Sequence, residues 1–248
     1  METYKIIIEY DGTRYGGFRK SKRGGAATIQ DKIEAVLNRM EQGQSFTLTA
    51  AVNTEAGIHS MGQTISYKTE QHFREQDIKD YMNQYLPQDI VVREVKQERV
   101  GFHAEFAMSA LLYEYRIQTG TYQNVLEHAY MDYIPEQLNL SAMKKGMKLL
   151  TGNVDFKSLN SNPRLKKSTL RTVDKLQMKV DSEEIKIYCQ IDQVWPGLIP
   201  AIYGVLIQLG KQKLKLEELI EGLKEGQLGS LYMPAPTKAI MLKQVLYL

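Results

Sequence analysis

The sequence is short of the residues that disulfide-stabilised and metal-binding proteins depend on. It contains one cysteine, Cys189, and four histidines among 248 residues. A single cysteine excludes an intramolecular disulfide and is typical of a reducing compartment, so we expect a cytoplasmic location. The histidines are scattered, without the spacing of metal ligands, so we expect no metal site.

Long apolar runs and a strong net charge are also missing. The longest apolar run, residues 194–209, is interrupted by Pro196 and Pro200 and is too short to span a bilayer. The first residues lead directly into a strand pattern, so we expect neither a signal peptide nor a membrane partner. The formal net charge is +3, which permits a polyanionic partner without requiring one.

What is present is a globular composition in which strand patterns alternate with amphipathic helices. The chain is 43% hydrophobic and long enough to bury a sizeable core. In the first half, strand patterns at 4–10, 64–67 and 90–95 alternate with helix patterns after Thr28 and around Ile78. The second half repeats this plan. The order of elements predicts an α+β fold built from ferredoxin-like layers.

Local signals predict where several elements begin and which side chains are buried. Thr28 and Asp31 form a capping-box pattern, and Ser141 is the expected N-cap of a helix in the second half. The helix around Ile78 is expected to turn Tyr85 inward. Strand 184–191 alternates cleanly, which places Cys189 inside as a small apolar residue.

A carboxylate in a turn between two strand patterns is the first candidate for chemistry. Residues 51–63 read Ala-Val-Asn-Thr-Glu-Ala-Gly-Ile-His-Ser-Met-Gly-Gln, with Glu55 two residues before Gly57. A carboxylate on a tight loop at strand ends is a common way to present a nucleophile or a general base. From the spacing alone, a solvated turn with an incidental acid is the better interpretation.

The second candidate is a basic, glycine-rich segment at residues 13–25. Cations bind phosphates and aromatic rings stack on bases, so the segment suits RNA. A solvated basic turn explains its composition about equally well. The residues that would contact RNA are Arg14, Tyr15, Phe18, Arg19, Lys20, Lys22 and Arg23.

Both candidates resemble motifs of the tRNA pseudouridine synthase A family. Residues 10–19 are similar to its opening motif, Tyr-Asp-Gly-Thr-x-Tyr-x-Gly-Phe-Gln, with Arg19 in place of Gln. The stretch around Glu55 resembles its active-site loop, Gly-Arg-Thr-Asp-Ala-Gly-Val-His-Ala, whose Asp is catalytic. Further similar stretches follow in the family's order at 28–30, 83–87, 102–106, 113–116, 152–156 and 235–247.

The resemblance implies two ferredoxin-like halves, 1–105 and 106–248, which share a continuous, mainly antiparallel mixed sheet. Helices would cover one face, and a cleft would lie between the halves. The implied reaction is isomerisation of uridine to pseudouridine in the tRNA anticodon arm, by a homodimer without metal or cofactor. Glu55 and Tyr113 would take the catalytic positions, and Asn53 and His59 would contact RNA. For Tyr113, geometry alone favours a core aromatic.

Four positions depart from the family pattern. The side chain of Glu55 is one methylene longer than Asp, and Asn53 replaces an Arg that helps displace the flipped base. Pro200 replaces the Arg that keeps the carboxylate ionised and aimed, and we expect it to bend its helix. Glu105 replaces another Arg.

Two interpretations therefore stay close to even. The first is a divergent, weak synthase that uses Glu55. The second is an inactive RNA-binding pseudoenzyme, acting as an RNA chaperone or as the partner of an active paralogue. A protein-interaction module that no longer binds RNA ranks last, because the basic segment survives.

Overall fold

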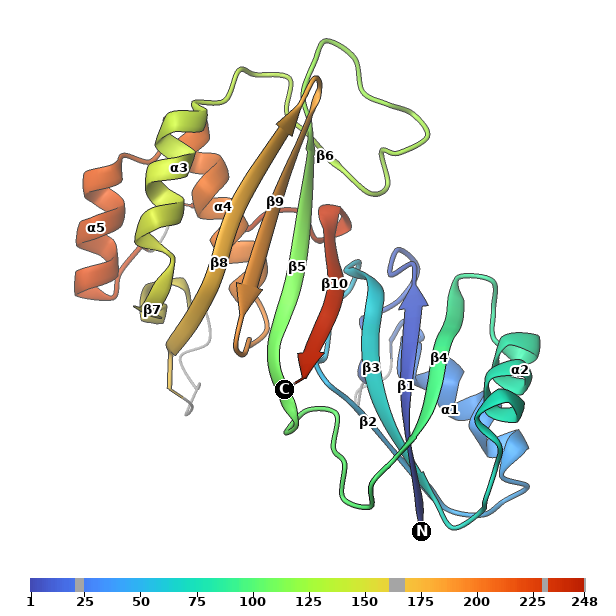
Figure 1. Ribbon diagram of the computed structural model, residues 1–248. Helices are drawn as coiled ribbons and strands as arrows, with labels where there is room; N and C mark the ends of the chain where they lie inside the picture. The colour runs from blue at the N-terminus through green and yellow to red at the C-terminus, as the bar shows by residue number, and fades with distance from the viewer. Residues whose placement is uncertain (21–24, 161–167, 229–231, 248) are drawn as a thin grey trace. The chain divides into compact units, whose positions relative to one another are not determined.

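The structure is a computed structural model of the chain (Figure 1). It describes residues 1–20, 25–160, 168–228 and 232–247. The chain forms two compact units, which we call unit 1 (Met1–Ser109 with Met241–Leu248) and unit 2 (Ala110–Ile240). The predicted halves, 1–105 and 106–248, differ from these units mainly at the C-terminus, where the last strand joins unit 1.

The sheet of unit 1 has the strand order β4-β1-β3-β10, with β2 also beside β3. Its strands are β1 (Glu2–Tyr10), β2 (Phe46–Ala50), β3 (His59–Thr69), β4 (Ile90–Glu98) and β10 (Ile240–Tyr247). Neighbours are antiparallel except β10, which runs parallel to β3 and pairs Met241 with His59. This pairing is why the C-terminal strand belongs to unit 1.

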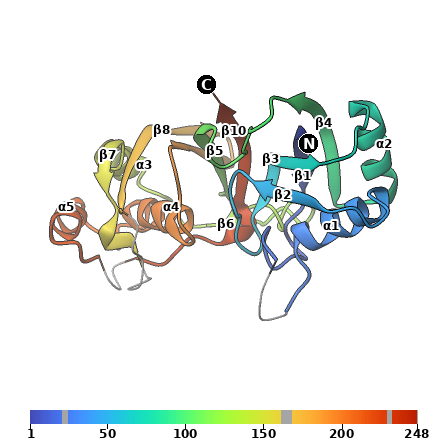
Figure 2. The ribbon, with the colours of Figure 1, turned by 90° about the horizontal axis from the view of Figure 1, so that it is seen from below.

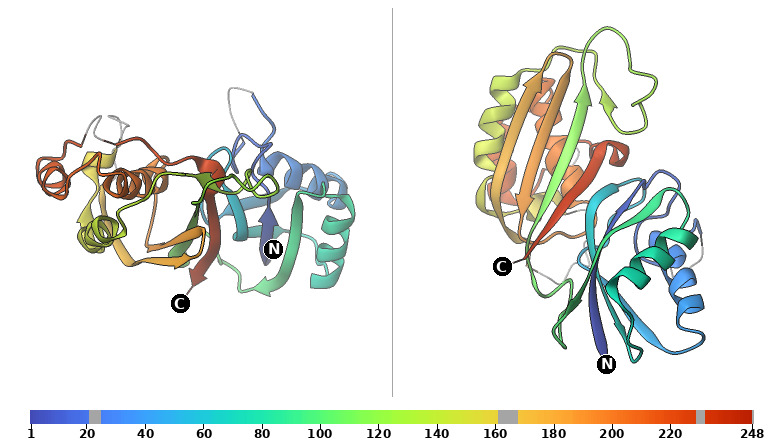
Figure 3. Two further views of the ribbon diagram at one scale, coloured as in Figure 1. Left: turned by 90° about the horizontal axis from the view of Figure 1, so that it is seen from above. Right: turned by 45° about the vertical axis from the view of Figure 1, so that its right-hand side comes forward.

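Two helices, α1 (Ile29–Met40) and α2 (Glu75–Tyr85), pack onto one side of this sheet (Figure 3). The predicted capping box of α1 is confirmed. Thr28 N–H donates to the Asp31 carboxylate at 2.9 Å, and Asp31 N–H donates to Thr28 Oγ1 at 3.2 Å. Two donors that the helix leaves unpaired are satisfied in this way, which defines where α1 begins.

The inward face of α2 is shorter than predicted. Ile78 and Met82 are fully buried, as expected from their spacing. Tyr85 is 46% exposed, so the prediction that it points inward is wrong. It is the last residue of the helix, and its ring lies against Tyr81 instead of the core, with ring centroids 4.7 Å apart.

Unit 2 orders its strands β5-β9-β8-β7, and β6 lies parallel to β5. They are β5 (Met108–Gln118), β6 (Asp132–Tyr133), β7 (Gly152–Asp155), β8 (Leu170–Asp181) and β9 (Glu184–Ile191). Figure 2 shows three helices on one side of these strands: α3 (Leu140–Leu149), α4 (Leu198–Gly210) and α5 (Leu216–Glu225). The predicted α+β class, with mainly antiparallel strands, is confirmed.

The strand β9 alternates as predicted, with every second side chain buried. Cys189 is fully buried, and this burial raises the pKa of its thiol to about 12. The thiol is therefore neutral at physiological pH, and Cys189 acts as a small apolar core residue.

Two local predictions in unit 2 are wrong. The N-cap of α3 is Asn139, whose side chain accepts a hydrogen bond from Ala142 N–H at 3.0 Å, and Ser141 lies inside the first turn. Pro200 does not interrupt α4, because it is the third residue after the N-cap Gly197. The N–H groups of a first turn have no acceptor within the helix, so proline removes no hydrogen bond there.

Candidate active site

Glu55 lies on the loop of residues 51–58, which connects β2 to β3 and which we call the Glu55 loop. Its side chain is half-buried, whereas Asn53 and Ala56 are exposed. The loop turns tightly: Ile58 N–H donates to Glu55 O at 3.2 Å, and Gly57 has a φ of +80°. Glycine adopts this left-handed backbone without strain, so it closes the turn two residues after the acid.

The Glu55 loop is anchored on its flanks by hydrogen bonds from β1, β3 and the segment that follows β1. Phe18 N–H donates to Thr54 O at 2.9 Å, and the Thr54 hydroxyl lies 2.7 Å from that of Tyr10. Gln63 Nε2 donates to Val52 O at 2.7 Å. Thr54, Tyr10 and Gln63 are buried, so these bonds are shielded from water. The backbone that leads into Glu55 is therefore held in one place.

Two glycines of the opening motif are required by this contact. A Cβ on Gly12 would lie 2.1 Å from Ile58 O, which is far inside van der Waals distance. Gly17 has a φ of +100°, and a Cβ there would lie 2.7 Å from Thr54 O. The opening motif and the Glu55 loop thus form one structure, in which backbone packs directly on backbone.

His59 supports this structure from inside. It is the first residue of β3 and only 2% exposed. Its Nδ1 lies 3.0 Å from both Gly12 N and Asp11 Oδ1. One ring nitrogen cannot serve both: unprotonated it accepts from Gly12 N–H, and protonated it donates to Asp11. We favour the first arrangement, because it gives the buried Gly12 N–H an acceptor. The predicted RNA contact at His59 would require this buried ring to become accessible.

The aromatic residues of the basic segment are in the core. Tyr15 is 6% exposed and Phe18 1%, so neither ring offers a face to a base. Tyr15 Oη donates to Asp89 Oδ1 at 2.6 Å, and the Arg14 guanidinium lies 2.6 Å from Asp89 Oδ2. Burial raises the pKa of Asp89, but the bonds from Tyr15 and Arg14 outweigh it, so this pKa lies below its ordinary value.

The remaining cations of the segment differ in how they are held. Arg19 is exposed. Lys20 Nζ lies 3.8 Å from the Asp31 carboxylate and 3.6 Å from that of Glu34, with its side chain 62% exposed. Exposed pairs of this kind contribute at most about 1 kcal/mol, so Lys20 can exchange them for a phosphate. Lys22 and Arg23 lie outside the described residues.

Tyr113, the other predicted catalytic residue, is in unit 2 on β5. It is 2% exposed and pairs in register with Cys189 on β9. This placement agrees with the core aromatic that geometry alone favours. Glu105, by contrast, is exposed.

Within the described ranges, no group of three or more His, Cys, Asp and Glu side chains is placed to hold a metal ion. Across the same ranges, none of the helices has both the length and the apolar character needed to cross a bilayer.

Comparison with known proteins agrees with this arrangement. Residues 6–107 match the family model of tRNA pseudouridine synthase. The chain is 32% identical over 247 residues to tRNA pseudouridine synthase A 1 of Clostridium tetani, covering 100% of both chains. It is 29% identical over 245 residues to tRNA pseudouridine synthase A 2 of Bacillus cereus, covering 99% of each. A Geobacillus kaustophilus relative, tRNA pseudouridine synthase A, is 32% identical over 209 residues, covering 84% of this chain and 80% of its own. The motifs, their mutual packing and this full-length similarity place the chain in the tRNA pseudouridine synthase A family.

Proposed function

We propose that this protein binds tRNA and slowly isomerises uridine to pseudouridine in the anticodon arm, with Glu55 as the catalytic carboxylate. The observation that carries the proposal is the anchoring of the Glu55 loop by Phe18, Tyr10 and Gln63. Such anchoring serves to aim one side chain, and it is not needed for a solvated turn. The names of the relatives support the reaction and the RNA substrate.

The chemistry explains why turnover should be slow. The uracil N-glycosidic bond must break, the base must turn, and a carbon–carbon bond must form while a carboxylate acts at the sugar or base. Glu55 carries the right group on a longer stem, and a misplacement of about 1 Å can cost about 10²-fold in rate. Asn53 and Pro200 supply no cation to aim it.

The other parts of the proposal come from the family resemblance. Asn53 is exposed beside Glu55 and is free to meet the flipped base through its amide. A role for Tyr113 against the base requires its buried ring to become accessible in the RNA complex. A homodimer and a cytoplasmic location belong to the same proposal.

Tritium release from unmodified tRNA transcripts labelled in uridine tests the assignment of Glu55. We expect slow but measurable release by the unaltered chain and none by Glu55→Ala, because no other acid lies on the Glu55 loop. Glu94→Ala, a change at an exposed acid on β4, should leave the rate unchanged.

Three other results would each change the conclusion. Release that survives in Glu55→Ala would remove Glu55 from the mechanism. Rapid release by the unaltered chain would show that the longer stem of Glu55 does not slow the reaction. Tight tRNA binding without any release would support the second candidate function, an RNA-binding pseudoenzyme, which the combined changes at Glu55, Asn53 and Pro200 favour.

A second expectation concerns the RNA footprint of the basic segment. Neutralising Lys20, Lys22 and Arg23 together should weaken binding to any tRNA. Each phosphate that is no longer bound should flatten the slope of log K against log salt by about 0.9 or less. Arg14→Gln is the comparison, because Arg14 is already held by Asp89 and should change the slope less. An unchanged slope in the triple variant would place the footprint elsewhere.

A further inference from the structure

Unit 2 contains a pocket of about 540 Å³ between α3 and β8, which lie side by side in Figure 1. We call it the α3–β8 pocket. Its cations are Lys144, Lys148 and Lys179, and its apolar side chains are Met147, Leu176 and Met178. None of these residues belongs to the site proposed above.

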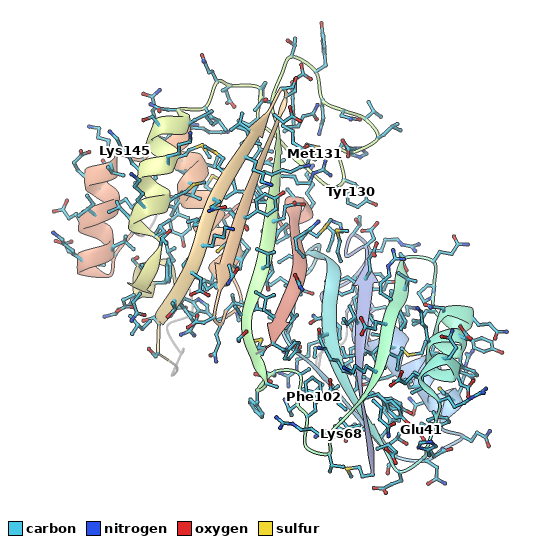
Figure 4. The ribbon with its side chains drawn as sticks, in the orientation of Figure 1. Glu41, Lys68, Phe102, Tyr130, Met131 and Lys145 are labelled. Carbon is cyan, nitrogen blue, oxygen red and sulfur yellow. The ribbon has the colours of Figure 1, made fainter. Side chains whose placement is uncertain are left out.

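Within the described part of unit 2, the cations of the α3–β8 pocket form no ion pair, although Lys179 Nζ lies over the ring of Tyr188, 5.6 Å from its centroid. The ion pairs of that part use Arg116, Lys186 and Lys211. Lys144 and Lys148 are four residues apart on α3, so they lie on the same face and repel each other. Lys145, labelled in Figure 4, adds a third cation to this helix, which contains no acid. An uncompensated group of cations around a hollow favours an anionic ligand.

The remaining surface of the pocket suits a flat, partly apolar chemical group. Met147 and Leu176 are buried and Met178 is half-buried, and methionine adapts well to aromatic rings. Among the described strands, β7 pairs with β8 only from Leu170 to Val173. Beyond that point β8 pairs with β9 alone, so its outer edge presents backbone donors and acceptors beside the pocket.

We infer that the α3–β8 pocket takes one nucleotide of a bound RNA strand. Lys144 and Lys148 hold its phosphate, and the base lies over Met178. The charge and the apolar surface together match a nucleotide better than a bare anion or a bare apolar group. The inference rests on the proposed function for the RNA itself, but it concerns a second contact outside the Glu55 loop.

The test compares two variants with equal loss of charge. Lys144→Gln with Lys148→Gln should weaken binding of an unmodified tRNA transcript and flatten its salt slope by about 0.7 for each phosphate that is no longer bound. The control is Lys213→Gln with Lys224→Gln, two exposed lysines of unit 2, which should leave the slope unchanged. Met178→Gln should weaken binding without changing the slope, because it removes only apolar contact. Thermal melting of each variant checks that all of them fold.

Three outcomes would overturn the inference. If the two double variants weaken tRNA binding equally, the pocket lysines act only through net charge. The second outcome is that uridine 5′-monophosphate binds the unaltered chain but not the variant Lys144→Gln with Lys148→Gln, while both bind tRNA equally well. In that case the pocket is a site for a free nucleotide. If the unaltered chain binds no tRNA at all, the proposed function fails and this inference fails with it. In the first two cases tRNA binding and tritium release by the unaltered chain persist, so the proposed function stands.

Discussion

A chain carrying Glu55→Asp, Asn53→Arg and Pro200→Arg together should form pseudouridine at least about 10²-fold faster than the unaltered chain. The aspartate shortens the reach of the carboxylate. In the family pattern that the sequence resembles, an arginine at position 53 displaces the base and an arginine at position 200 aims the acid. Because the three act on one step, each single change should recover little, and the combined gain should exceed the sum of the singles. The measurement is tritium release at saturating tRNA.

The position of Pro200 makes this experiment practicable. It lies in the first turn of α4, so an arginine there is compatible with the helix as it stands. The side chain of Pro200 is buried, so an arginine there would destabilise the fold unless its guanidinium finds an acidic partner.

A charge-matched control is Glu94→Asp with Gln84→Arg and Gln227→Arg, all at exposed positions. It should change tRNA affinity slightly and the rate at saturation not at all. A triple variant that binds tRNA and stays inert would show that these three positions do not account for the weak activity.

Rapid pseudouridine formation by the unaltered chain would require another cation to orient the Glu55 carboxylate. Arg116 is held by Glu184 at 2.6 Å and by Glu127 at 3.1 Å, so recruiting it would break an existing network.

Gly17→Ala should lower the free energy of unfolding by about 2–4 kcal/mol and loosen the Glu55 loop. Part of the loss, about 1–2 kcal/mol, is the cost of a left-handed backbone at alanine. The remainder, about 1–2 kcal/mol, comes from forcing a Cβ to within 2.7 Å of Thr54 O. Urea denaturation measures the total, and amide exchange at Phe18, whose N–H donates to Thr54 O, reports on the loop.

Gly43→Ala separates the two contributions. Gly43 has a φ of +91°, close to that of Gly17, but a Cβ there would meet nothing within 4 Å. It should therefore lose only the backbone part, and amide exchange at Phe18 should stay slow. Equal losses in the two variants would show that the contact between the opening motif and the Glu55 loop adds no stability. Of these two variants, only Gly17→Ala should lose a large part of its rate of pseudouridine formation.

Much of the fold could be predicted from the sequence because the signals are local. The capping box joins Thr28 to Asp31 three residues away, and the alternation of β9 follows from the geometry of one strand. The motif around Glu55 is also a local signal, because its residues are consecutive, and it identified the loop that carries the candidate acid. Ser141 failed as an N-cap because Asn139, two residues earlier, has an equally good capping side chain.

The sequence by itself determined the α+β class, the family motifs and the position of Glu55 on a tight turn. Only the tertiary structure decided what surrounds that turn. Arg14 meets Asp89 75 residues away, Gly12 meets His59 47 residues away, and Ser60 meets Leu242 182 residues away. Basic and aromatic residues in one segment look alike in sequence whether they face solvent or the core. Packing distinguishes them. Burying the apolar rings of Tyr15 and Phe18 in the core stabilises the fold, whereas burying the charges of Arg19 and Lys20 would cost free energy, so these two stay exposed.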